Sequence, residues 1–246
     1  MLEIKNLNVT YDQSTVALED VSMSLPLNRI YGIIGPNGAG KSTFIKAMLN
    51  LIPHRGEVLF NGQALKHHAK RISYVEQRSS IDMDFPMSVF KCVLTGTYPG
   101  LGLFKRAGQK EKERAERALK EVNMWDFRDR QIAQLSGGQF QRILIARAIA
   151  QEADLIFLDE PFVGVDVTSE SIIVGILHEL ADNGVTIFIV HHDMSKVKKY
   201  FNGLILLKKK LIASGTVEEV FTKENLSEAY GENMFMFAEG GQKDDQ

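Results

Sequence analysis

The sequence has few features of a secreted or membrane-spanning protein. Its 246 residues contain one cysteine, Cys92, so no disulfide can form within the chain. That is typical of a reducing compartment. No apolar run approaches the roughly 20 residues that a membrane-spanning helix needs, and the N-terminal residues show no cleavable leader. We therefore expect a soluble protein, one that reaches a membrane only by binding something that spans it.

An excess of charge of one sign is also missing. Lys and Arg number 29 and Asp and Glu 31, which gives a formal net charge of −2. This balance does not favour coating of nucleic acid or an anionic membrane surface, so nucleic acid is not an expected partner. Hydrophobic residues make up 44% and charged residues 24% of the chain. That composition excludes disorder of the whole and suits one large or two small globular domains.

Short apolar segments alternate with helical patterns, which indicates an α/β fold. Strands are expected at 2–9, 21–25, 29–34, 57–60, 72–75, 155–158, 185–190, 203–207 and 211–213, and helices at 41–49 and 168–180. Asn61-Gly62 signals a hairpin, and Thr216 with Glu219 forms a capping box that opens a last helix. The alternation predicts a mainly parallel sheet with a helical insert at about 85–150.

Within the insert, one segment has the pattern of an amphipathic helix. Ala115, Ala118, Leu119 and Val122 recur at i, i+3, i+4 and i+7, with Lys, Glu and Arg between them. This spacing puts the apolar side chains on one face of a helix.

A glycine-rich segment predicts a phosphate-binding loop. Residues 35–42, Gly-Pro-Asn-Gly-Ala-Gly-Lys-Ser, fit Gly-x4-Gly-Lys-Ser between a strand and a helix, and Thr43 follows. At average composition about 0.01 such matches are expected in a chain of this length. Glycines let backbone N–H groups converge on phosphate oxygens, and the helix N-terminus favours an anion. Lys41 would reach the β- and γ-phosphates, and the Ser42 hydroxyl would bind Mg²⁺.

A second candidate centre ends the apolar strand at 155–158. Asp159 and Glu160 follow this strand directly, and ligands collect at such strand ends in open α/β sheets. Asp159 can hold Mg²⁺, usually through water, and Glu160 can orient or deprotonate an attacking water. The alternative is a pair of solvated acids at the turn before Pro161.

A third segment carries a family resemblance. Leu135-Ser136-Gly137-Gly138-Gln139 resembles the signature of the ABC-type ATPases. Ser136 can cap the helix that follows, and the two glycines expose N–H groups to an anion. The alternative is an ordinary helix N-cap.

Further residues match motifs of this family in the same order. Tyr11 matches the aromatic that stacks on adenine, Gln77 the glutamine that links metal and water to the helical insert, Asp166 the D-loop aspartate, and His192 the switch histidine at the γ-phosphate. Tyr11 could instead pack in the core at a strand end, and Gln77 could be a solvated strand terminus. Because neighbouring residues on a strand point to opposite faces, we interpret His192, and not His191, as functional.

The resemblance implies a P-loop NTPase fold in a single ABC ATPase domain. It has a RecA-like core with an antiparallel β subdomain, at about 1–84 and 151–225. A helical subdomain at about 85–150 and a C-terminal extension at 226–246 complete the expected organisation.

The resemblance also implies ATP and Mg²⁺ as cofactors. The expected ATP-binding residues are Tyr11, Gly35, Pro36, Asn37, Gly38, Ala39, Gly40, Lys41, Ser42 and Thr43. Catalysis is expected from Glu160, His192 and Gln77, and Mg²⁺ binding from Ser42, Gln77 and Asp159. In this family two copies face head to tail, so Ser136, Gly137, Gly138, Gln139 and Asp166 would contact ATP bound to the opposing subunit.

Three departures from the commoner family pattern resemble one branch. They are Gln139-Phe140-Gln141-Arg142, His191-His192-Asp193 and the run at 160–164. They resemble the ATPase subunits of bacterial manganese, zinc and iron importers, most of all the manganese members. This implies a homodimer at the cytoplasmic face of the membrane, bound to permease subunits and linked through them to an extracellular metal-binding lipoprotein.

Other functions stay open at this point. An importer for zinc, iron or another solute has the same nucleotide site, and so has a soluble ABC ATPase of the iron–sulfur cluster assembly type. A non-catalytic, ATP-gated binding module is disfavoured by Glu160 and His192. Tandem-domain members are disfavoured because the chain holds one phosphate loop and one signature.

Overall fold

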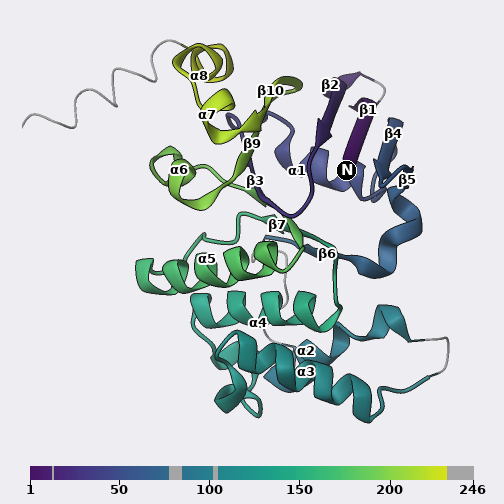
Figure 1. The fold of residues 1–246 in the computed structure, drawn as a ribbon, viewed down its shortest axis with the longest axis vertical. Helices are drawn as coiled ribbons and strands as arrows, with labels where there is room; N and C mark the ends of the chain where they lie inside the picture. The colour runs from purple at the N-terminus through teal and green to yellow at the C-terminus, as the bar shows by residue number, and fades with distance from the viewer. Residues whose placement is uncertain (13, 78–84, 102–104, 232–246) are drawn as a thin grey trace, which may run out of the picture. The chain divides into compact units, whose positions relative to one another are not determined.

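The computed structural model describes residues 1–12, 14–77, 85–101 and 105–231 (Figure 1). Contacts divide the chain into two compact units. The first unit comprises 1–26, 31–66 and the residues from 190 onward, and the second comprises 27–30 and 67–189. The expected boundaries at 84, 150 and 225 stay a prediction, and most of the expected C-terminal extension lies outside the described residues.

The first unit contains an antiparallel sheet of four strands in the order β2-β1-β4-β5. The strands are β1 (Leu2–Tyr11), β2 (Thr15–Leu25), β4 (Arg55–Phe60) and β5 (Gln63–Ala64). The predicted hairpin at Asn61-Gly62 is confirmed, because Phe60 pairs with Gln63 across these two residues. Both have positive φ, 50° and 78°, as a type I′ turn requires.

Three more strands belong to the first unit, and the phosphate loop follows the first of them. They are β3 (Ile30–Ile34), β9 (Gly203–Lys208) and β10 (Lys210–Thr216). From Tyr31 onward β3 runs parallel to β9, and β9 pairs antiparallel with β10. All five residues of β3 are buried, as expected for a short apolar run covered on both faces. Helix α1 (Lys41–Met48) follows β3 after the loop.

The predicted helix opens after Thr216, but it is not the last one. The capping box itself is present, with Thr216 accepting a hydrogen bond from the backbone N–H of Glu219 and Glu219 accepting one from that of Thr216. However, α7 (Val217–Val220) ends after one turn, and α8 (Lys223–Tyr230) begins with Thr222 as its own N-cap. The short α6 (Val197–Tyr200) precedes β9.

The second unit has its own strands, with β7 between β6 and β8. They are β6 (Ile72–Val75), β7 (Leu155–Asp159) and β8 (Thr186–Val190). β6 and β7 are parallel, as predicted, and every residue of β7 and β8 is buried. Helix α5 (Val167–Asp182) connects β7 to β8.

The predicted helical insert is present in the second unit as α2 (Val89–Thr95), α3 (Gln109–Glu121) and α4 (Gly137–Ala150). The three helices contact one another, and α4 also contacts α5 (Figure 1). The amphipathic prediction for α3 is confirmed, because Ala115, Ala118, Leu119 and Val122 are fully buried. Short 3₁₀ helices lie at Leu65–Arg71, Tyr98–Gly100, Trp125–Phe127, Ile132–Gln134 and Met194–Lys196.

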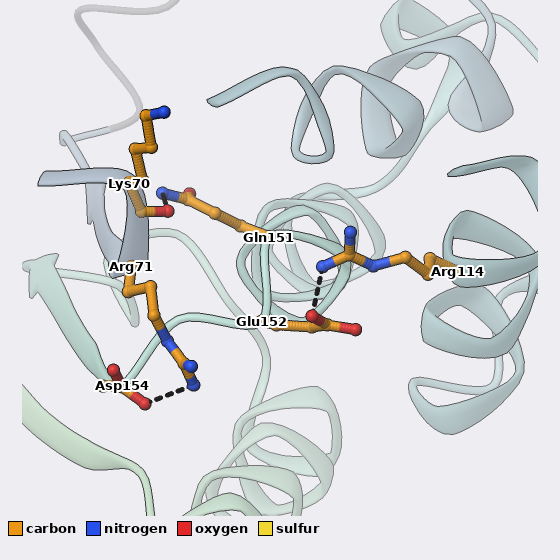
Figure 2. A network of polar contacts seen from close by, with 6 residues as sticks. All are labelled: Lys70, Arg71, Arg114, Gln151, Glu152 and Asp154. Atoms are coloured by element: carbon orange, nitrogen blue, oxygen red, sulfur yellow. Dashed lines mark hydrogen bonds and ion pairs between the residues drawn. The ribbon is translucent and has the colours of Figure 1, made fainter. Parts of the chain in front are cut away.

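A polar network fixes the C-terminal end of α4 to its neighbours (Figure 2). Nε2 of Gln151 donates to the backbone oxygens of Lys70, at 3.1 Å, and of Ile72, at 2.7 Å. Glu152 forms an ion pair with Arg114 of α3 at 2.5 Å. Arg71 and Asp154 form a further ion pair at 2.6 Å. Side chains at the end of α4 thus hold both α3 and the start of β6.

Gln151→Ala is expected to lower the free energy of unfolding by about 1 kcal/mol, because two backbone carbonyls lose one shared donor. Urea denaturation followed by circular dichroism measures this. The control is Gln134→Ala, which removes an exposed glutamine side chain and is expected to change stability by less than about 0.5 kcal/mol. Equal stability of the two variants would contradict an anchoring role for Gln151.

Candidate functional site

The predicted phosphate loop lies between β3 and α1, as the sequence pattern requires. Gly35 has φ 152° and Gly40 has φ 91°, values that L side chains rarely adopt. A Cβ at Gly35 would lie 2.1 Å from the backbone oxygen of Leu207, and one at Gly40 would lie 2.7 Å from that of Ala17. The close approach of these backbones explains why the loop needs glycine at both positions.

Lys41 folds back over this loop. Its Nζ donates to the backbone oxygens of Gly35, at 2.9 Å, and of Pro36, at 3.1 Å. The first turn of α1 holds no acidic residue, so the ammonium group and the helix N-terminus both favour an anion. Asn37, Gly38 and Ser42 are exposed. The loop therefore presents a positively charged, glycine-lined surface that suits a phosphate chain.

Tyr11 lies at the end of β1 in the same unit. Its side chain is 40% exposed, and its hydroxyl lies 3.3 Å from Oγ1 of Thr43, one residue beyond the loop. The alternative of a buried core aromatic is therefore excluded. An exposed ring beside the phosphate loop is free to stack on a planar base.

The two adjacent histidines after β8 differ in environment, as predicted. His191 is buried, with ring centroids 6.0 Å from Tyr200 and 5.5 Å from Phe201. Its backbone N–H donates to Ile33 at the end of β3. His192 is exposed. The structure thus gives His191 a packing role and leaves the His192 side chain accessible.

In the second unit, the two predicted acids stand at the end of β7. Asp159 is 8% exposed, and Glu160 is half-buried. Glu160 has φ 50°, a left-handed conformation that is uncommon outside glycine and costs of order 1 kcal/mol or more. Nε2 of Gln77 donates to Oε2 of Glu160 at 2.8 Å. Gln77 is therefore not a solvated strand terminus, and it holds the Glu160 carboxylate.

One neighbour of these acids was missed in the sequence. Tyr74 of β6 lies near enough to Asp159 for the negative charge of that carboxylate to act on its phenol. Burial, followed by the negative charges of Asp159 and Glu76, raises the pKa of Tyr74 well above its usual value. The alternation of β6 puts Tyr74 on one face, but only the pairing of β6 with β7 brings it to Asp159.

The signature segment begins α4, with Ser136 as the N-cap. Oγ of Ser136 accepts from the backbone N–H of Gln139 at 3.3 Å, and Oε1 of Gln139 accepts from that of Ser136 at 3.0 Å. The predicted cap is thus a reciprocal capping box. A Cβ at Gly138 would lie 2.3 Å from Cβ of Ser169, so this glycine permits close packing of α4 on the start of α5.

Asp166 is the N-cap of α5 and binds Ser169, the residue against which Gly138 packs. Its Oδ1 accepts from the backbone N–H of Ser169 at 2.9 Å. Hydrogen bonds from Ser169, through its side chain first and its backbone second, lower the pKa of Asp166. The second unit therefore brings together the signature and the D-loop aspartate, two segments that the sequence separates.

The predicted residues divide between the two units. Tyr11, the loop at 35–43 and His192 belong to the first, and Gln77, Ser136–Gln139, Asp159, Glu160 and Asp166 belong to the second. No group of three or more His, Cys, Asp and Glu that could hold a metal occurs among residues 1–12, 14–77, 85–101 and 105–231. The Ser42 hydroxyl in the first unit, and the Gln77 amide and the Asp159 carboxylate in the second, are each oxygen donors, the ligand type that Mg²⁺ takes.

Comparisons with known proteins agree with these features. The model of the ABC transporter family matches residues 18–163, more than half of the chain. The chain is 51% identical over 240 residues to the manganese transport system ATP-binding protein MntB of Listeria monocytogenes, covering 97% of this chain and 100% of that protein. It is 46% identical to the zinc transport system ATP-binding protein TroB of Treponema pallidum, covering 99% of this chain and 92% of that one.

A solved structure agrees as well. An ATP-binding cassette of an ABC transporter in its ADP conformation superposes with a TM-score of 0.82 at 26% identity, covering 94% of this chain and 98% of that one. In the part of the chain that the structure describes, no helix is both long and apolar enough to cross a membrane. Fold, motifs and relatives agree, and this chain belongs to the ABC transporter family.

Proposed function

We propose that this chain is the ATP-hydrolysing subunit of a bacterial importer that takes up a divalent metal ion, manganese. ATP hydrolysis coupled to transport is the activity of ATP-binding subunits in this family. The choice of metal is carried by the relative named for manganese transport, at 51% identity over 97% of the chain. The zinc relative, at 46%, makes zinc the second candidate.

In this proposal the first unit binds the nucleotide. The N–H groups of the loop at 35–43 and the ammonium of Lys41 hold the phosphates, and the exposed ring of Tyr11 stacks on adenine. Ser42, Gln77 and Asp159 hold Mg²⁺, which when bound neutralises charge on the phosphate oxygens. The position of the Lys41 ammonium group beside the N-terminus of α1 supports this assignment, because the charge and the helix N-terminus both favour a bound phosphate.

Glu160 is the proposed general base. Its carboxylate orients the attacking water and accepts its proton, and His192 stabilises the γ-phosphate end of the transition state. The hydrogen bond from Gln77 supports this role, because it holds one carboxylate oxygen in a fixed orientation. Gln77 thereby connects the catalytic carboxylate to the segment that leads into the helical region.

The proposed working unit is a homodimer of this chain. Ser136–Gln139 and Asp166 of one copy would contact ATP bound to the phosphate loop of the other copy. The helix N-terminus that follows the exposed Ser136 supports this, because it offers backbone N–H groups to an anion. ATP would close the dimer, and hydrolysis with product release would reopen it.

The proposed partners are permease subunits at the cytoplasmic face of the membrane. The segment at 77–98 would contact a cytoplasmic helix of the permease, and an extracellular metal-binding lipoprotein would deliver the ion to the permease. The transported metal would not touch this chain. A soluble ABC ATPase of iron–sulfur cluster assembly has the same nucleotide site, and the transport names of the relatives favour the importer.

Cells that carry the Glu160→Gln variant in place of the normal protein are expected to lose most of their manganese uptake. Accumulation of radiolabelled manganese, zinc and iron, each measured alone, tests this. Glu179→Gln, which removes an exposed negative charge from α5, is the control and should leave uptake intact. Selective loss of zinc uptake or of iron uptake would show that the cargo is that metal and not manganese. Unchanged uptake of all three metals would contradict a metal importer.

A further inference from the structure

We infer that His191 is a positioning residue for His192, and that its buried ring holds the exposed ring of His192 in place for the γ-phosphate. This inference rests on the proposed function, in which His192 stabilises the γ-phosphate end of the transition state. A direct contact between the two rings supports it, because their centroids lie 5.9 Å apart with an interplanar angle of 31°.

The two rings meet because both histidines lie beyond the end of β8. Neighbouring residues point to opposite faces only while a strand continues, and β8 ends at Val190. The separation of the two rings is in the range typical of paired aromatic rings. His191 is buried and His192 is exposed, so the pair consists of an inner ring and an outer ring.

Two buried aromatic side chains hold the inner ring. The centroid of the His191 ring lies 6.0 Å from that of Tyr200 and 5.5 Å from that of Phe201. Both of these aromatic residues are buried in the first unit. In a close-packed interior a ring cannot be displaced unless its neighbours also move. The contact between the histidines therefore ties His192 to a rigid part of the unit.

This aromatic cluster is anchored on β3, the strand that leads into the phosphate loop. The backbone N–H of His191 donates to the backbone oxygen of Ile33 at 3.1 Å. A Cβ at Gly32 would lie 2.7 Å from the ring of Phe201, so the glycine lets this ring lie directly against the backbone of β3. His191 thus ties His192 to the same strand from which the phosphate loop continues.

The backbone that follows His192 is held as well. Oδ1 of Asp193 accepts from the backbone N–H of Ser195 at 3.0 Å and from its hydroxyl at 2.6 Å. Oδ2 of Asp193 lies 3.5 Å from Nζ of Lys196. With the backbone held on both sides, the side-chain torsions of His192 are the freedom that remains. The ring of His191 restricts these torsions.

His191→Ala is expected to lower kcat for ATP hydrolysis roughly 10- to 100-fold, because it removes the ring that restricts His192. The KM for ATP is expected to change by less than about twofold, since the phosphate loop is untouched. Phosphate release by the purified full chain over a range of ATP concentrations gives both values. His191→Phe keeps an aromatic ring against Tyr200 and Phe201 and is expected to restore most of the turnover.

A double-mutant cycle tests whether His191 acts through His192. In the His192→Ala background no ring is left to position, so adding His191→Ala is expected to lower kcat by less than about twofold further. A merely structural role predicts the same fold loss in both backgrounds, and this result overturns the inference. Val220→Ala removes packing from a buried position of α7 in the same unit and, as the control, should leave kcat unchanged.

The same cycle separates this inference from the proposed function. If His192→Ala hydrolyses ATP at the ordinary rate, the role of His192 in the proposed function is wrong, and the inference is wrong with it. If His192→Ala loses turnover while His191→Ala equals the Val220→Ala control, the positioning role of His191 is wrong and the proposed function stands. Calorimetric titration with ATP completes the test, because a fall in ATP affinity by the same factor as kcat in His191→Ala also overturns the inference.

Discussion

Replacing Glu160 with glutamine is expected to lower ATP turnover at least about 100-fold, while ATP still binds. A carboxylate can accept a proton from water, and a carboxamide cannot. The substitution is nearly isosteric, and the amide oxygen of the new side chain can still accept the hydrogen bond that Gln77 donates at 2.8 Å. The loss should therefore come from the missing base and not from a displaced loop. Phosphate release measured at saturating ATP checks this.

The same variant is expected to accumulate as an ATP-bound dimer, because the step that reopens the dimer is blocked. Size-exclusion chromatography with light scattering, in the presence of ATP and Mg²⁺, measures this. Glu179→Gln removes one negative charge from the exposed face of α5 and should behave as the unchanged protein. Ordinary hydrolysis rates in Glu160→Gln would remove Glu160 from the proposed mechanism.

Lys41→Ala is expected to weaken ATP binding roughly 10- to 100-fold. The substitution removes a charge-assisted hydrogen bond to phosphate, and such bonds contribute about 1.5–3 kcal/mol. Lys41 also bonds the backbone oxygens of Gly35 and Pro36, so its loss takes away two contacts that hold the loop before ATP arrives. Calorimetric titration with ATP gives the dissociation constant directly.

Lys46→Ala is the matched control for this experiment. Lys46 lies on the same helix, in its last turn, away from the phosphate loop. Its removal changes the net charge by the same amount, so it corrects for the general attraction of a cation to ATP. If both variants bind ATP as the unchanged protein does, the phosphate loop is not the nucleotide site.

Local motifs could be predicted from the sequence because each is built from residues that adjoin one another. The phosphate loop depends on glycines whose conformations need no distant partner, although Gly35 and Gly40 also make close approaches to other strands. The Ser136 cap is closed within three residues, by Gln139. The apolar runs of β3 and β7 predicted buried strands, and that of β8 a strand, because the composition of each run is itself the signal.

The end of α7 illustrates where local reasoning fails. The capping box at Thr216 predicts where a helix begins but not how long it continues. A second cap, Thr222, accepts from the backbone N–H of Asn225 and starts α8 only two residues after α7 ends. A short-range signal for the start of a helix thus says little about its length, which depends on what the helix packs against.

What the sequence by itself determined is therefore the list of chemical groups: a phosphate loop, two acids after a strand, a capped signature and a family that uses them together. Only the tertiary structure decided which groups touch. Gln77 donates a hydrogen bond to Glu160 although 83 residues separate them, because the parallel pairing of β6 with β7 brings the ends of these strands together. The physical reason is that strand register is set by packing across the whole sheet, which no local stretch of sequence encodes.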